Sequence, residues 1–145
     1  MKVQDVMTEG PASIRSTTPV REAIDVLQSL NARHLPIVDG HGELVGILSD
    51  RDLRMFWSPD IGSETRPDLM ARLETPVCRV MCTVLFAVHP ESDVRDVIDL
   101  MIDQKIGAVP VLDSEGGLIG IVSYVDLLRE LRVLAADVST EGVGN

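Results

Sequence analysis

The chain has 145 residues and a formal net charge of −10, and 45% of its residues are apolar while only 3% are aromatic. This length suits one compact domain whose core is built from aliphatic side chains. The acidic balance excludes non-specific attraction to nucleic acid or anionic lipid, so we expect neither nucleic acid nor membrane as a partner.

Two further features bear on the compartment. Cys78 and Cys82 are too few for a disulfide framework, and residues 1–5 carry no apolar signal-peptide core. No apolar run approaches the roughly 20 residues that span a bilayer. We therefore expect a cytoplasmic protein.

The first half of the chain predicts two helices and three strands. A short extended segment at Ile14 precedes an amphipathic helix, which we expect Thr18 to cap with Pro19 in the first turn and which runs to Leu30. Two apolar strands, 35–38 and 44–48, flank a polar, glycine-containing turn at 39–42. A second helix begins at Ser49.

The second half repeats this order after a linker that contains a short helical run at 68–73. Val88 lies in an extended segment, Ser92 is the expected cap of the next helix, and a further helix begins at Ser123 after two strands. Residues 137–145 have no hydrophobic period and are expected to be disordered.

The two halves are copies of one unit. Pro36 and Pro110, Gly46 and Gly120, and Asp52 and Asp126 are all separated by the same 74 positions, without a gap. We place repeat 1 at 1–57, a linker at 58–76, repeat 2 at 77–134 and a flexible tail at 135–145. The predicted fold class is α/β (α+β), with each repeat ordered strand, helix, strand, strand, helix. Packing of the repeats with pseudo-twofold symmetry would cover their apolar faces and create two equivalent clefts.

The residues of both copies resemble the cystathionine-β-synthase (CBS) domain, and the tandem resembles a CBS pair, or Bateman module. The resemblance runs from about Val3 to Leu131. It is carried in the first copy by the segments 5–8, 18–23, 33–39 and 46–53, and in the second by 80–81, 109–113 and 120–127. The second copy departs from the first at Cys82, Asp93 and Val97, which stand at the positions of Thr8, Pro19 and Ala23.

The resemblance implies an adenine-nucleotide site in the cleft between the repeats. A helix start offers backbone N–H groups to phosphate, the serine hydroxyl adds a donor, and the aspartate can accept hydrogen bonds from a ribose diol. The nucleotide-binding residues that it implies are Ile14, Thr18, Arg33, His34, Leu35, Pro36, Ser49, Arg51, Asp52, Val88, Gly107, Ala108, Val109, Pro110, Ser123 and Asp126. We expect the first copy to bind more tightly, because it alone has Arg33, His34 and Arg51.

Each of these features also has a structural interpretation. Ser-x-x-Asp before an apolar run is a capping box that needs no ligand. His34 could be a packed or surface histidine, and Arg51 a solvated helix residue. The methionines at 7, 55, 70, 81 and 101 are expected to fill the core.

The sequence predicts no catalytic residue and no metal site. Cys78 and Cys82 lack the further ligands that tetrahedral zinc needs and the base that a catalytic thiol needs. The chain also lacks a glycine-rich lysine loop of the nucleotide-hydrolase type.

Three functions are therefore in competition. The first is a stand-alone regulatory module that binds AMP, ADP, ATP, S-adenosylmethionine or NAD as a ligand rather than a catalytic cofactor, forms homodimers, and acts in trans on an unknown effector protein. The second is a ligand-free module for protein interaction or dimerisation. The third, an enzyme acting on nucleotides, is disfavoured because the sequence has no catalytic set.

Overall fold

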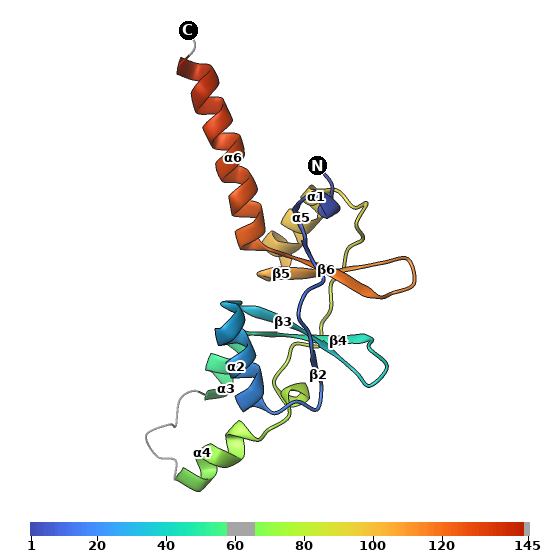
Figure 1. Ribbon diagram of the computed structural model, residues 1–145, viewed down its shortest axis with the longest axis vertical. Coiled ribbons are helices and arrows are strands. Elements are labelled where there is room, and N and C mark those ends of the chain that lie inside the picture. The colour runs from blue at the N-terminus through green and yellow to red at the C-terminus, as the bar shows by residue number, and fades with distance from the viewer. Residues whose placement is uncertain (58–65, 144–145) are drawn as a thin grey trace. The chain divides into compact units, whose positions relative to one another are not determined.

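The computed structural model describes residues 1–57 and 66–143, over which short strands and helices follow one another in the predicted order (Figure 1). The elements are α1 (Val3–Val6), β1 (Thr8–Glu9), β2 (Ile14–Arg15), α2 (Val20–Leu30), β3 (His34–Val38), β4 (Leu44–Ser49), α3 (Asp50–Trp57), α4 (Arg66–Leu73), a 3₁₀ turn η2 (Val77–Arg79), α5 (Val94–Gln104), β5 (Ala108–Leu112), β6 (Leu118–Ser123) and α6 (Tyr124–Val143). The α/β repeat fold is thus confirmed.

Contacts between residues divide the chain into two units. Unit 1 contains Met1–Pro11 and Phe86–Asn145, and unit 2 contains Ala12–Leu85. Each unit has one three-stranded sheet, ordered β1-β6-β5 in unit 1 and β2-β3-β4 in unit 2. These units differ from the repeats, because each unit takes its opening segment from the other repeat.

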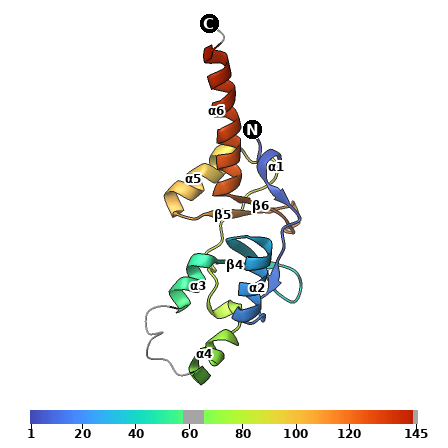
Figure 2. The ribbon, with the colours of Figure 1, turned by 60° about the vertical axis from the view of Figure 1, so that its left-hand side comes forward.

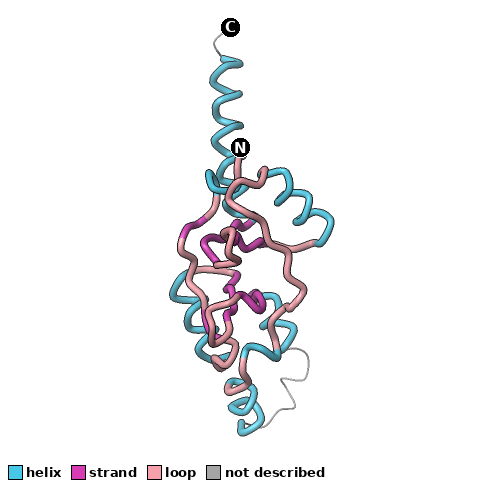
Figure 3. The backbone as a smooth tube through the Cα atoms, turned by 90° about the vertical axis from the view of Figure 1, so that its right-hand side faces the viewer, coloured by secondary structure: helices cyan, strands magenta, loops and turns pink. Residues whose placement is uncertain are grey.

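Unit 1 places α1, α5 and the first turns of α6 around its sheet (Figures 2 and 3). Strand β6 pairs antiparallel with both β1 and β5, and Val88 forms a parallel bridge with Val111. The core is almost entirely valine, since the enclosed side chains are Val3, Val88, Val97, Val109, Val111 and Val122.

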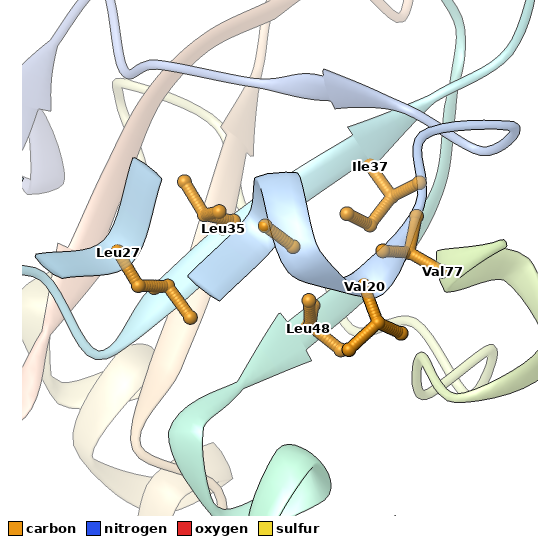
Figure 4. Close-up of a cluster of buried hydrophobic side chains, with 7 residues drawn as sticks. Val20, Leu27, Leu35, Ile37, Leu48 and Val77 are labelled. Carbon is orange, nitrogen blue, oxygen red and sulfur yellow. The ribbon is translucent and has the colours of Figure 1, made fainter. Parts of the chain in front are cut away.

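Unit 2 builds its core in the same way. Strand β2 runs parallel to β3, which pairs antiparallel with β4. The buried cluster comprises Val20, Ala23, Leu27, Leu35, Ile37, Leu48 and Val77 (Figure 4). Alternation along the strands sends Leu35, Ile37 and Leu48 into this cluster, so the neighbouring residues face the other side of the sheet.

The predicted helix caps are each wrong by one residue. The cap of α2 is Pro19 and that of α5 is Asp93, whose side chain accepts a 2.9 Å hydrogen bond from the Arg95 N–H. Ser92 Oγ instead accepts from the His89 N–H in the preceding turn. At α5 two adjacent polar residues, Ser92 and Asp93, offered two good caps, and the turn geometry selects Asp93. At α2 the cap position is taken by Pro19, which makes no side-chain cap bond.

The opening segments of the two repeats are exchanged, and their contacts match at the 74-residue offset. In unit 1 the Val3 N–H donates to the Ser92 carbonyl, and in unit 2 the Val77 N–H donates to the Thr18 carbonyl, at 2.9 and 2.8 Å. The side chains of Val3 and Val77 are completely buried in the two cores. Each core is therefore closed by a valine from the other repeat.

Two glycines permit this close approach. A Cβ at Gly120 would lie 2.7 Å from Met7 Sδ, and one at Gly46 would overlap Met81 Sδ and lie 3.1 Å from the Cys82 carbonyl oxygen. Strand β1 pairs with β6 through Thr8 and Ile121, and Cys82 forms the corresponding bridge with Ile47. The glycines leave room for the methionines beneath these pairings.

Several sequence expectations change at the surface. The tail expected to be disordered from residue 137 is helical, because α6 continues to Val143. Met55 and Met70 are exposed rather than core fillers, whereas Met7, Met81 and Met101 pack against the cores as expected. The loop part of the predicted linker at 58–65 lies outside the described residues. Within the described ranges, no helix has the length and hydropathy needed to cross a membrane.

Candidate functional site

Each unit has a junction where a strand runs directly into a helix beside the start of the neighbouring strand. The first junction consists of Arg33 and His34 at the start of β3 together with the turn Ser49–Asp52. The second consists of Gly107 and Ala108 at the start of β5 together with the turn Ser123–Asp126. The structure thus brings together, within each unit, the residues that the sequence predicted to act together.

The first junction contains a complete capping box. The Ser49 N–H donates to Asp52 Oδ2 at 2.9 Å, and the Asp52 N–H donates to Ser49 Oγ at 3.0 Å. The Asp50 N–H donates to the Arg33 carbonyl at 2.9 Å. These contacts do not engage the N–H of Arg51 in the first turn of α3, nor Asp52 Oδ1. Within the part of the chain that the structure describes, one backbone donor and one carboxylate oxygen of this junction have no partner.

The second junction repeats these bonds and adds two contacts. The Ser123 N–H donates to Asp126 Oδ2 at 2.8 Å, the Asp126 N–H donates to Ser123 Oγ at 3.3 Å, and the Tyr124 N–H donates to the Gly107 carbonyl at 3.0 Å. The Ser123 hydroxyl also donates to Asp126 Oδ2 at 3.0 Å. Arg129 Nη1 lies 3.6 Å from Asp126 Oδ1. Both carboxylate oxygens of Asp126 are therefore engaged within the chain.

Arg129 is a site residue that the sequence analysis missed. It stands three residues after Asp126 on the same helix, a spacing that places the two side chains together. The equivalent position in the first repeat is Met55, which cannot pair with Asp52. The i, i+3 spacing was readable from the sequence and would have identified this difference.

The strand register puts His34 on the same face of the sheet as Ser49. The two residues are directly opposed across β3 and β4, as Ala108 and Ser123 are across β5 and β6. Directly opposed residues have their side chains on one face and their Cβ atoms about 5 Å apart. His34 thus faces the junction, and Leu35 next to it faces the core.

The surroundings of His34 favour the neutral form of its imidazole. Burial lowers the pKa of the imidazole, the carboxylates of Asp50 and Asp52 act in the opposite direction, and Arg33 adds to the lowering. Because burial is the largest contribution, the pKa of His34 lies below its ordinary value. A neutral imidazole can both donate and accept a hydrogen bond, which suits recognition of a polar ligand edge.

The remaining predicted residues divide into core and surface positions. Leu35, Val88 and Val109 have side chains in the hydrophobic cores, and Ile14 packs against one of them. Pro36 and Pro110 are also fully buried. These residues can offer a ligand mainly their backbone atoms. Thr18 is half-buried and uses its carbonyl to hold Val77, while Arg51 is exposed at the start of α3.

The cysteines belong to neither junction. Cys78 is in the turn η2 and Cys82 bridges to Ile47, and both thiols are free and exposed. Among the described residues, no group of three or more histidine, cysteine or acidic side chains could hold a metal ion.

The fold and the paired junctions define a class of protein, a tandem-repeat α/β module. The sequence profile of the CBS domain matches residues 3–58 and 77–133. The chain therefore belongs to the CBS domain family, as a tandem pair.

Related proteins show two kinds of context for this module. A CBS domain-containing protein of Dictyostelium discoideum is 32% identical over 87% of this chain and 88% of its own length. L-aspartate semialdehyde sulfurtransferase of Methanocaldococcus jannaschii is 29% identical over 88% of this chain, which spans only 22% of that enzyme. The similarity to that enzyme is thus confined to a part of it the size of a CBS pair.

Two solved structures similar to this chain contain adenosyl ligands. One is a CBS domain pair in complex with 5′-methylthioadenosine and S-adenosyl-L-methionine, with 28% identity, a TM-score of 0.74, and coverage of 90% of this chain and 95% of that one. The other is CBSX2 in complex with AMP, with 26% identity, a TM-score of 0.75, and coverage of 92% and 98%.

Proposed function

We propose that this chain is a regulatory module that binds an adenosyl ligand, such as AMP, ADP or ATP, at its strand–helix junctions and signals to a partner protein. The observation that carries the proposal is the first junction, where a helix start, a half-buried histidine and an uncommitted carboxylate oxygen lie together. Related CBS pairs hold AMP or S-adenosylmethionine, which is the same ligand chemistry.

Two arginines at the first junction, which also holds the carboxylates of Asp50 and Asp52, favour a ligand with phosphate. The whole chain carries a net charge of −10, which repels a nucleotide at long range. Arg33 and Arg51 supply local positive charge at the first junction, whereas Gly107 and Val125 occupy the equivalent positions of the second. We infer that phosphate-bearing nucleotides prefer the first junction.

The proposal includes no chemical step, and the ligand acts as a signal. Differential binding to two arrangements of the module would shift their populations, which a partner protein could read. A cytoplasmic location belongs to this proposal as well. The exposed free thiols of Cys78 and Cys82 are compatible with a reducing compartment.

A second candidate function is a ligand-free interaction module. One observation favours it, because the capping boxes satisfy most polar groups of Ser49, Asp52, Ser123 and Asp126 without a ligand. This candidate predicts no change of melting temperature with nucleotides. A ligand at 100 times its Kd would instead stabilise the protein by about 2.7 kcal/mol.

Calorimetric titration of the Asp52→Ala variant with AMP, ADP, ATP, S-adenosylmethionine and NAD tests the proposal. Loss of a hydrogen-bonded carboxylate should weaken nucleotide binding by about 1.5–3 kcal/mol, or roughly 10- to 150-fold. Asp93→Ala is the matched control, since Asp93 also caps a helix but lies at neither junction. No binding of any of these ligands to the unaltered protein would exclude the sensor function, and equal affinity of both variants would exclude the role of Asp52.

A further inference from the structure

Helix α4 belongs to unit 2 and is held there by contacts at its C-terminal end (Figure 1). Glu74, directly after the helix, forms an ion pair of 2.6 Å with Arg21 Nε on α2. The Thr75 carbonyl accepts a 2.8 Å hydrogen bond from the Val20 N–H at the start of α2. These contacts attach the end of α4 to the first helix of the unit.

Arg72, in the last turn of α4, makes the corresponding attachment to α3. Its Nη1 donates a 2.9 Å hydrogen bond to the Phe56 carbonyl, and its guanidinium carbon lies 5.7 Å from the centroid of the Phe56 ring. Phe56 itself packs against the core of unit 2. The last carbonyls of a helix have no partner within that helix and carry a partial negative charge. Arg72 therefore caps the C-terminus of α3.

This cap matters because α3 is short. Its 8 residues make about two turns, and an isolated helix of that length is marginal in water. The first turn of α3 contains Asp52, whose carboxylate belongs to the first junction, and the N–H of Arg51. In a helix of two turns, loss of the last turn also weakens the first. The two ends of α3 are thus stabilised together.

The second repeat does not need such a cap. The position of Phe56 corresponds to Glu130, which lies inside α6, and α6 has 20 residues in all. The Glu130 carbonyl is therefore followed by further helical turns and has an acceptor role within the helix. A cap at this position concerns only the unit that contains the first junction.

We propose that Arg72 is a positioning residue for the first junction. By capping the end of α3, it keeps the start of α3 in the geometry that binds the ligand. This inference rests on the proposed function, because ligand affinity is its readout. Coupling between two sites is reciprocal. The factor by which release of α4 weakens ligand binding is therefore also the factor by which bound ligand strengthens the attachment of α4.

Calorimetric titration with AMP, ATP and S-adenosylmethionine tests the first half of the proposal. Arg72→Gln should weaken binding by about fivefold or more, the lower end of typical coupling between sites. Arg79→Gln is the matched control, because it removes the same charge from an exposed position in η2. It should change the affinity by less than about twofold, since exposed charges are screened by salt. Both variants should fold, because neither arginine belongs to a core cluster.

Hydrogen exchange of the amides in and directly after α4 tests the second half. The Glu74 N–H, for example, donates to the Met70 carbonyl and is released when α4 opens. In the unaltered protein, saturating ligand should slow this exchange by the same factor that Arg72→Gln costs in affinity. In Arg72→Gln the ligand should not slow it. An arginine with a purely structural role would leave the exchange of α4 independent of ligand, so this measurement decides the question even if the variant does not fold.

Three results would overturn the proposal. One is equal affinity of the Arg72→Gln variant and the unaltered protein. Another is an equal loss in Arg72→Gln and Arg79→Gln, which would reduce the effect to net charge. The third is exchange of the α4 amides that ligand does not slow. In each case the unaltered protein still binds the ligand, and the proposed function stands. If none of the three ligands bound the unaltered protein, both proposals would fail together.

Discussion

The first and second junctions have the same hydrogen-bonded frame but different charged surroundings. Both have a serine and an aspartate that cap a helix, and both anchor that helix to the adjacent strand. Around this frame, the first has Arg33, His34 and Arg51, whereas the second has Arg129 against its aspartate. The comparison separates the two roles of Ser-x-x-Asp. The cap is structural in both repeats, and the availability of the carboxylate depends on its neighbours.

The largest expected effect tests whether the two units are closed in the same way. Val3→Ala and Val77→Ala should each lower the free energy of unfolding by about 2 kcal/mol, because each removes a completely buried side chain supplied by the other repeat. Urea denaturation measures both losses, with the exposed Val84→Ala as the control. A loss at only one position would show that the two closures are not equivalent.

A smaller effect concerns how strongly the carboxylates of Asp52 and Asp126 contribute to ligand binding. Arg129→Met should free Asp126 Oδ1 and strengthen ligand binding at the second junction, and Met55→Arg should weaken binding at the first. Each change should be at most about 1 kcal/mol, or roughly fivefold, since Arg129 is largely exposed. Two-site calorimetry measures both affinities, and Arg95→Met provides an arginine control away from both junctions. Changes in the same direction for the two swapped residues would contradict this account.

The smallest effect is a pH dependence that only the first junction should have, since Ala108 replaces His34 in the second. Because the folded state lowers the pKa of His34, the unfolded chain binds the proton more readily. Stability should therefore be constant above about pH 6.5, the ordinary pKa of histidine, and fall as the pH drops below it.

His34→Gln should reduce this loss of stability in acid, whereas the same change at the exposed His41 should not. Denaturant titrations between pH 5 and pH 7.5, an interval of about one unit on either side of the ordinary pKa, provide the measurement. If the His34→Gln variant lost as much stability between pH 6.5 and pH 5 as the unaltered protein, about the interval below the ordinary pKa of histidine, another group would be the cause.

Much of this architecture could be predicted because its signals are local or repeated. The apolar period of α2 and the polar turn at 39–42 identify the helix and the hairpin within a few residues. The offset of 74 residues predicts the same elements a second time, in the second repeat. Ser49 and Asp52 could be paired from their spacing alone, and both interpretations of that spacing had to stay open. The cap exists in the structure, and ligand binding stays a prediction.

Other features could not be predicted because they depend on contacts distant in sequence. Nothing in residues 1–11 shows that they pair with β6 rather than with their own repeat, although the match of residues 6–7 with residues 80–81 indicated that the segment was part of the repeat. The helical course of α6 past residue 137 was missed for a different reason. Serine and glycine near its end lowered the local propensity, and α6 extends a helix already nucleated at Tyr124.

The exchanged opening segments have an unequal consequence for folding. Unit 2 is one continuous stretch, Ala12–Leu85, whereas unit 1 is assembled from two stretches that this entire span separates. If unit 2 melted first, unit 1 would have to hold together the ends of a flexible loop of about 74 residues, at an entropic cost of roughly 4 kcal/mol. Unit 2 bears no such cost when unit 1 melts. The fragment that folds by itself should therefore be Ala12–Leu85, whose two ends lie inside the repeats. A ligand that binds and stabilises unit 2 would also stabilise unit 1, to which it does not bind.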